Sequence, residues 1–200
     1  ILDGEKIVTD CGAYLYTSSY KDRNKFRSTA CHNTPQVDGE EINRFVRPDY
    51  LWSLHYDATP QVHAWNTDGH ITEFVGSHAG YSRLEAQLAP KRRIRLEHAS
   101  HTLTVTDEIR GSGDHHVEIP LHLAAGVDIS EQNDNGFLLE KNGKLFRLTW
   151  LANGGWQVRR EPARVSPSYG VVTRTLKLLW CFDGLLPAKL VIVVVPVTKF

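Results

Sequence analysis

The sequence contains no methionine, no excess of charge of either sign and only one long apolar run. The 23 basic residues balance 23 acidic ones, so no overall positive charge can displace counterions from nucleic acid. The apolar run, residues 190–197, is too short to cross a bilayer. We therefore expect neither nucleic-acid binding nor membrane insertion. Because the chain begins at Ile1 and has no methionine in 200 residues, we expect it to be part of a longer protein.

Cysteine is also scarce. Cys11, Cys31 and Cys181 are odd in number and include no Cys-x-x-Cys pair, which argues against a disulfide framework, a zinc ribbon or a redox motif. Their simplest interpretation is that of buried small hydrophobic side chains. The chain also lacks a Gly-x-Ser-x-Gly elbow, a P-loop and a dinucleotide-binding fingerprint.

Apolar and polar residues alternate with a period of two along much of the chain. This pattern is typical of strands with one buried face, and it covers residues 102–109, 116–123, 145–151 and 175–182. Residues 190–197 are apolar in both registers, which predicts a strand buried on both faces.

Turn-forming residues separate these stretches at intervals of about ten to twenty residues, as in antiparallel sandwiches. The turns are predicted at residues 66–69, 134–136, 141–143 and 153–155, and residues 83–88 are the only stretch considered for a helical turn. We therefore predict one all-β domain over residues 1–200, an antiparallel two-layer β-sandwich.

Residues 8–40 differ from the rest because polar and aromatic side chains are dense there. We expect a strand-like opening, a loop after Gly12 and an extended stretch at residues 32–37. Loops attached to a rigid sheet are where binding groups concentrate. The polar and aromatic candidates in this segment are Asp10, Tyr14, Tyr16, Tyr20, Arg27, His32 and Asn33.

Several motifs, three in this segment and two later in the chain, point to a known family. They are Asp-x-Gly-x-Tyr at residues 10–14, Phe-Arg-Ser-Thr-Ala-x-His-Asn-Thr at 26–34 and Val-Asp-Gly at 37–39, followed by His-Ala-Gly-Tyr at 78–81 and Ser-Pro-Ser-Tyr-Gly at 166–170. On these motifs, which run over nearly the whole chain, the sequence resembles the C-terminal β-sandwich domain of the heparinase II/III-like polysaccharide lyases.

The resemblance implies a two-part enzyme in which a helical toroid precedes the β-sandwich and an acidic polysaccharide lies between them. The implied reaction is β-elimination at a uronic acid. In the family, the base and the group that neutralises the substrate carboxylate lie on the helical domain. All catalytic residues are therefore expected upstream of Ile1, and this part is expected to be inactive without its own N-terminal helical domain. The implied location is periplasmic or secreted, in a bacterium, with the signal segment outside this chain.

The resemblance also implies a zinc site. In zinc-containing members, an upstream histidine, the aspartate of the turn and the histidine of the longer motif bind the ion, which corresponds here to Asp10 and His32 with the third ligand missing. Carboxylate oxygen and imidazole nitrogen are suitable zinc ligands. The alternative is a turn-capping carboxylate at Asp10 and a hydrogen-bonded loop histidine at His32.

Cys11 follows Asp10, and Cys31 precedes His32. Neighbours in an extended chain point to opposite faces. If Asp10 and His32 converge on an ion, Cys11 and Cys31 could converge behind it. We therefore hypothesise that they lie within disulfide reach, at a Cα separation below about 7 Å.

Five residues are predicted to contact substrate: Tyr14, Tyr16, Arg27, Asn33 and His78. Tyr14 and Tyr16 lie near the implied cleft, and the guanidinium of Arg27 suits carboxylate or sulfate. Two other functions stay open: a non-catalytic carbohydrate-binding sandwich, and a structural domain in which the Asp10–His32 pair only fixes a loop.

The basic run at residues 91–95 has a form often linked to heparin-like polyanions. Its alternative is a solvated edge strand whose charges discourage aggregation.

Overall fold

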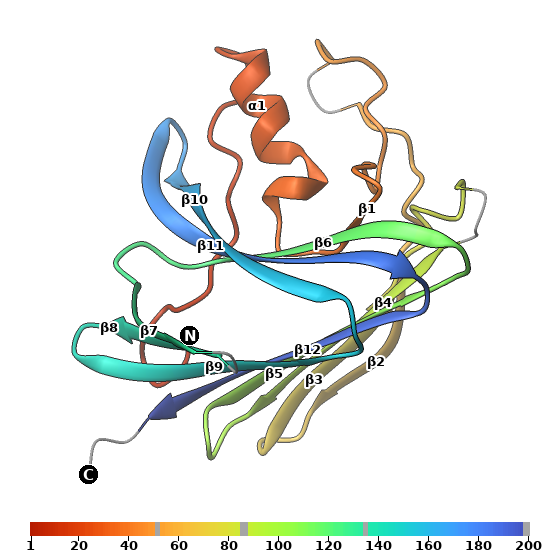
Figure 1. Cartoon of the computed structure of the whole chain (residues 1–200). Coiled ribbons are helices and arrows are strands. Elements are labelled where there is room, and N and C mark those ends of the chain that lie inside the picture. Colours follow the sequence, from red (N-terminus) through yellow and green to blue (C-terminus); the bar gives the residue numbers. More distant parts are fainter. Residues whose placement is uncertain (51–52, 85–87, 134–135, 198–200) are drawn as a thin grey trace.

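The computed structural model describes residues 1–50, 53–84, 88–133 and 136–197, and in it two antiparallel sheets pack face to face (Figure 1). This confirms the predicted two-layer β-sandwich. The smaller sheet has the order β1 (Gln36–Val37), β6 (Asp114–His122), β11 (Val171–Leu185), β10 (Trp156–Ser168). The larger sheet has the order β2 (Gln61–Thr67), β3 (Ile71–Ser77), β4 (Ala89–Glu97), β5 (Thr102–Arg110), β12 (Ala188–Val197), β9 (Lys144–Ala152), β8 (Gly136–Lys141), β7 (Asp128–Asn133).

The core lies between the two sheets and is built from the alternating apolar positions. Trp180 of β11 and Phe146 of β9 are fully buried there. β12 lies between β5 and β9 and buries Leu190, Ile192 and Val194 on the core side. Its outer valines are only half-buried, so the prediction of full burial on both faces of residues 190–197 is wrong. The reason is that the segments outside the two sheets cover the smaller sheet instead (Figure 1).

Tight turns join the strands where the sequence predicts them, between β2 and β3, β8 and β9, and β9 and β10. In the first of these, the Asp68 carboxylate accepts hydrogen bonds from the backbone N–H groups of His70 and Ile71 at 3.0 and 2.9 Å. Side-chain capping of this kind is the reason that Asp and Asn favour turns. The predicted turn at 134–136 lies partly outside the described residues.

The basic run occupies β4, which is hydrogen-bonded to β3 on one side and β5 on the other. The alternative of an edge strand is therefore wrong. Its arginines pair with carboxylates of neighbouring residues, in the pairs Arg92–Asp107, Arg93–Glu73 and Arg95–Glu97. These paired charges leave little capacity for a polyanion at this strand.

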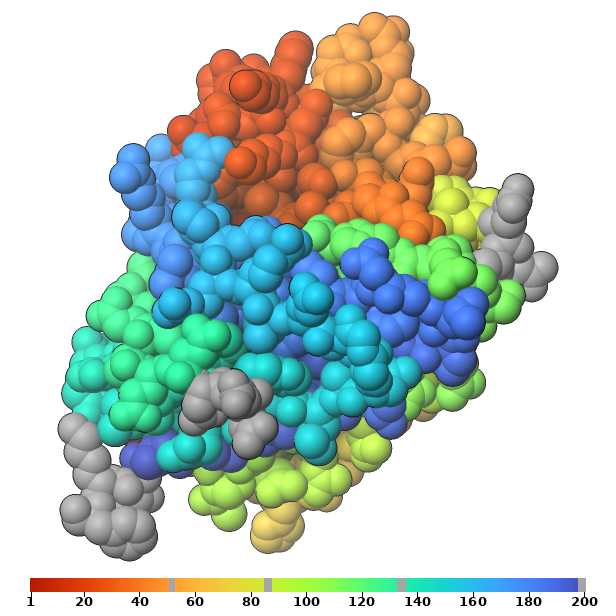
Figure 2. Space-filling view, in the orientation of Figure 1, coloured from red at the N-terminus to blue at the C-terminus, as the bar shows by residue number. Residues whose placement is uncertain are grey.

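The N-terminal segment lies across the outer face of the smaller sheet, as the red and orange parts of Figures 1 and 2 show. Val8 forms a β-bridge with Leu123, and the Ser166 N–H donates to the Cys11 carbonyl at 2.7 Å. Further along, β1 pairs with β6. These backbone contacts hold both halves of the segment on one rigid sheet, with the Asp10 and His32 regions between them.

The same segment contains a helix that the sequence did not predict, α1 (Tyr20–Arg27), followed by a short 3₁₀ helix, η1 (Thr29–Cys31). Ser19 caps α1 by accepting a hydrogen bond from the Asp22 N–H at 3.2 Å. Only Arg23 and Phe26 of the helix are buried, so it has no apolar stripe for a periodicity argument to detect. The helical turn considered at 83–88 lies partly outside the described residues.

Candidate metal centre and its surroundings

Residues 10–12 form a turn that fixes the orientation of the Asp10 carboxylate. Asp10 Oδ2 accepts a hydrogen bond from the Gly12 N–H at 2.8 Å. Gly12 has a φ of +77°, and a Cβ at this position would lie 2.3 Å from the Ser166 carbonyl oxygen. Only glycine fits here, both because of the left-handed backbone and because of the close approach of β10. The turn therefore fixes the carboxylate relative to the sheet.

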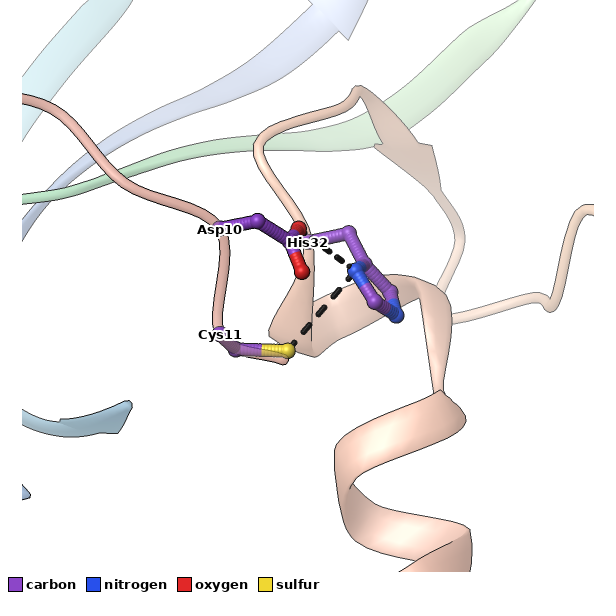
Figure 3. A group of neighbouring side chains, drawn as sticks. All are labelled: Asp10, Cys11 and His32. Carbon is purple, nitrogen blue, oxygen red and sulfur yellow. Dashed lines mark hydrogen bonds and ion pairs between the residues drawn. The ribbon is translucent and has the colours of Figure 1, made fainter. Parts of the chain in front are cut away.

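His32 is brought to this carboxylate from the end of η1. Its Nδ1 lies 2.8 Å from Asp10 Oδ1 (Figure 3). The backbone around η1 is held by Glu41, whose carboxylate accepts hydrogen bonds from Ser28 Oγ and the Thr29 N–H at 2.5 and 2.7 Å. The two residues predicted as ligands therefore converge, although 22 positions separate them in the chain.

Asp10 and His32 each stabilise the charged form of the other. Burial acts to raise the pKa of Asp10, but hydrogen bonds from His32 and Gly12 hold it below its ordinary value. The hydrogen bond to Asp10 raises the pKa of His32 against the opposing effect of burial. An ionised carboxylate is ready to bind a cation, whereas the histidine must lose its proton to become a ligand.

Cys11 contributes a third donor atom that the sequence argument missed. Its buried Sγ lies 3.7 Å from His32 Nδ1 (Figure 3), and the donor atoms of Asp10, Cys11 and His32 all lie within 4.8 Å of one another. The prediction that Cys11 points away from the ligand pair is wrong, because residues 10–12 form a turn and not a strand. Carboxylate, thiolate and imidazole are all zinc ligands, so this donor set fits zinc.

Cys31 lies beside Cys11. Both are free thiols, and their side chains interact. The hydrogen bond from Cys11 lowers the pKa of Cys31 to about 7 although burial opposes the change, and the same interaction together with burial raises the pKa of Cys11. Their side chains interact, while the hypothesised Cα separation below about 7 Å and a disulfide between them stay predictions.

Arg27 is the predicted substrate contact that the structure places with the Asp10–His32 pair. It lines a cavity of about 350 Å³ together with both residues. Its Nη1 donates to the Tyr50 carbonyl at 3.2 Å, and its guanidinium lies 4.0 Å from the centre of the Phe45 ring. These contacts fix the guanidinium at the cavity wall.

The two tyrosines lie outside that cavity lining. The Tyr14 ring packs on Phe26 with ring centres 5.2 Å apart. Tyr16 is 45% exposed, and its ring lies 5.0 Å from that of Tyr169. Tyr16 and Tyr169 together form an exposed aromatic pair next to the N-terminal segment. The contact of Tyr14 and Tyr16 with substrate stays a prediction.

Asn33 joins the segment to the smaller sheet. Its Nδ2 donates to the Thr9 carbonyl at 2.7 Å, and its Oδ1 lies 2.8 Å from both the backbone nitrogen and the Nδ1 of His122. His122 is buried, and burial together with Lys177 lowers its pKa to about 4. Sequence reasoning missed this histidine because its partner is 89 residues away.

His78 lies apart from this group. It lines a smaller cavity of about 180 Å³ next to Arg92 and Asp107, and its ring packs edge-on against Tyr81. Burial lowers the pKa of His78, which keeps the imidazole neutral. The structure therefore does not bring His78 to the Asp10–His32 cavity.

No helix in the described part of the chain is long and apolar enough to span a membrane. A comparison with curated protein sequences finds no match. Three solved structures have a similar fold: the heparinase III BT4657 gene product (TM-score 0.77, 20% identity), the heparan sulfate lyase HepC from Pedobacter heparinus (0.76, 16%) and a heparinase III (0.74, 15%).

The alignments cover 98–99% of this chain but 29% of each of those proteins, so the chain spans less than a third of their length. The sequence comparison is more specific than these fold similarities. Residues 1–197 match the family described as heparinase II/III-like, C-terminal. The chain therefore belongs to the heparinase II/III-like family and represents its C-terminal domain.

Proposed function

We propose that this chain is the β-sandwich part of a polysaccharide lyase that cleaves a uronic-acid-containing polysaccharide by β-elimination. The family match over residues 1–197 carries this proposal. The solved neighbours, a heparinase III and a heparan sulfate lyase, support an acidic polysaccharide as substrate. The base is expected on the family's helical domain, outside residues 1–200, so we propose that these residues alone are inactive.

The proposed reaction removes the proton from C5 of the uronate and expels the glycosidic oxygen from C4. The C5–H electron pair becomes the C4–C5 double bond, and the leaving oxygen takes up a proton. Negative charge develops on the uronate carboxylate, so a positive or hydrogen-bonding group must face it. In this chain Arg27 is the candidate for holding an anionic group of the substrate, because its guanidinium lines the Asp10–His32 cavity.

We propose that Asp10, Cys11 and His32 hold a zinc ion, and their donor atoms within 4.8 Å of one another support this. Bound zinc would supply a rigid tie between the turn and η1 and a positive charge at the cavity. Of the chain's own groups, Asp10 provides an ionised carboxylate, while His32 must release its proton to bind.

The zinc proposal is tested with cobalt as a spectroscopic substitute. The protein is expected to show a thiolate-to-cobalt charge-transfer band that Cys11→Ser removes and Cys181→Ser keeps, since Cys181 is a free buried thiol on β11. Metal analysis of the purified protein gives the stoichiometry. Equal metal content in the protein and in an Asp10→Asn/His32→Gln variant would contradict the site.

The lyase proposal is tested on the full-length parent protein. It is incubated with heparan sulfate and with unsulfated uronate polymers, and the ultraviolet absorbance of the unsaturated uronate is followed. The expected result is new absorbance with at least one polymer. No product from any of them, together with retained binding of the polymers, would favour the non-catalytic carbohydrate-binding alternative.

A further inference from the structure

A second cavity, of about 690 Å³, lies between the N-terminal segment and the outer face of β10 and β11. Phe26 and Cys31 form its wall on the side of α1 and η1, and Thr175 and Lys177 of β11 lie on the other side. Figure 1 shows α1 above this pair of strands. The volume is within the range of about 300–1,000 Å³ that small-molecule sites occupy.

The lining is strongly cationic. Four positive side chains, Lys25, Arg164, Arg174 and Lys177, face one carboxylate, Glu161. Glu161 is paired with Lys177 at 3.3 Å. Among the described residues, neither Lys25 nor Arg174 has an ion-pair partner. In a chain without net charge, this cavity therefore has a local excess of positive charge.

Two of the cations lie directly opposite each other. Arg164 on β10 and Arg174 on β11 are register partners. Arg164 forms an ion pair with Asp22 at 3.6 Å, whereas Arg174 has no ion-pair partner among the described residues. Like charges at such positions destabilise a sheet, and an anion beside Arg174 would reduce the repulsion. The arginines of β4, by contrast, are all paired with carboxylates. The cavity differs from β4 in that two of its four cations have no ion-pair partner among the described residues.

The remaining lining suits a sugar ring. Pro162 and Ala163 provide apolar surface beside the charges, whereas the Phe26 ring is almost fully buried at the cavity wall. His122 also lines the cavity and is neutral above about pH 4, because burial and Lys177 lower its pKa. A ligand with anionic groups on a ring that has apolar faces would match both kinds of surface.

We propose that this cavity binds an acidic oligosaccharide segment, with its anionic groups at Lys25 and Arg174. The proposal rests on the proposed function, because it assigns a second contact region for the same polysaccharide. Phe26 lines this cavity and also the Asp10–His32 cavity, so the two are neighbours on either side of the segment.

The test measures binding of a size-defined heparan sulfate tetrasaccharide and of its desulfated form by calorimetry. Lys25→Ala/Arg174→Ala removes the two unpaired cations. Lys21→Ala/Arg147→Ala is the matched control, with an exposed lysine of the same helix and an exposed arginine of β9. We expect the cavity variant to lose at least about tenfold in affinity, since each charge-assisted hydrogen bond contributes about 1.5–3 kcal/mol and 1.4 kcal/mol is tenfold. The control should lose less than about twofold.

The two ligands identify the anionic group. A loss confined to the sulfated form assigns the cavity to sulfate, and a loss with both forms assigns it to carboxylate, and both results support the proposal. Equal affinities of the cavity variant and the control variant for both forms would overturn it. Arg174→Lys, which keeps the charge, should retain more of the binding than the cavity variant. Circular dichroism of the cavity variant checks that it is folded.

This result is separable from the lyase test. If the parent protein yields unsaturated uronate while the cavity variant binds like the control, the cavity proposal fails and the lyase proposal stands. If no polymer is cleaved but the cavity variant alone loses binding, the lyase proposal fails and the cavity remains a binding site for acidic oligosaccharides.

Discussion

His122 makes the stability of the protein depend on pH in a defined window. Its side chain is 2% exposed, and burial, with a smaller effect of Lys177, lowers its pKa from an ordinary 6.5 to about 4. Because the folded pKa lies below the unfolded one, the unfolded state takes up a proton between pH 6.5 and 4 and the folded state does not. Stability is therefore fully present above pH 6.5 and decreases as the pH falls towards 4.

The size of the effect follows from the difference between the two pKa values. One pKa unit corresponds to 1.36 kcal/mol, so His122 alone should lower the free energy of unfolding by about 3 kcal/mol between pH 7 and pH 4. Other groups also titrate in this range. Comparison with His122→Gln isolates the contribution, since glutamine retains an N–H donor for the Asn33 oxygen that faces His122 Nδ1 at 2.8 Å.

The assay is urea unfolding at constant ionic strength, followed by tryptophan fluorescence at several pH values between 4 and 7. Between the ends of this range, the wild-type protein should lose about 3 kcal/mol more than His122→Gln. His70→Gln, in the exposed turn between β2 and β3, controls for the loss of a histidine at the surface. Parallel curves for the wild type and His122→Gln would refute the reasoning.

Three further results are expected. Phe26→Ala should lower the free energy of unfolding by about 3–5 kcal/mol, because the ring is 1% exposed; a loss below about 1 kcal/mol in denaturant unfolding would contradict this. Asp107→Asn should cost about 3–5 kcal/mol in the same assay, because it leaves the Arg92 guanidinium without its buried charge partner, and an unchanged midpoint would argue against it. A mild disulfide oxidant should join Cys11 and Cys31, with a mass loss of two hydrogens and about 3 kcal/mol of added stability; an unchanged mass would reject the pairing.

The strands could be predicted because their signal is local. Side chains alternate about each strand, so residues 102–109 and 145–151 reveal one buried face without any knowledge of their partners. The same signal overestimated the burial of residues 190–197, because valine is common in strands whether its face is covered or half-exposed. It did not detect α1, whose burial consists of one arginine and one phenylalanine.

Buried polar contacts could not be predicted because their partners are distant in the chain. The guanidinium of Arg23 is 1% exposed and donates to the carbonyl groups of Tyr16, Pro48 and Tyr50. No sequence pattern predicts which carbonyl groups will accept from a buried guanidinium, since carbonyl groups are present at every residue. The family motif did indicate Asp10 and His32, whose 22-residue separation has no local periodicity.

Cys11 shows where the alternation argument fails and why that matters for the site. The rule that neighbouring side chains diverge holds only while the backbone is extended. Here the Asp10 carboxylate bonds to the Gly12 N–H, and Gly12 is left-handed, so the chain turns within three residues and places the thiol 3.7 Å from His32 Nδ1. The thiol also contacts Cys31, so metal binding and disulfide formation would compete for one sulfur atom. Reduced protein should therefore bind cobalt more tightly than oxidised protein, and Cys31→Ser, which cannot form the disulfide, should bind it equally under both conditions.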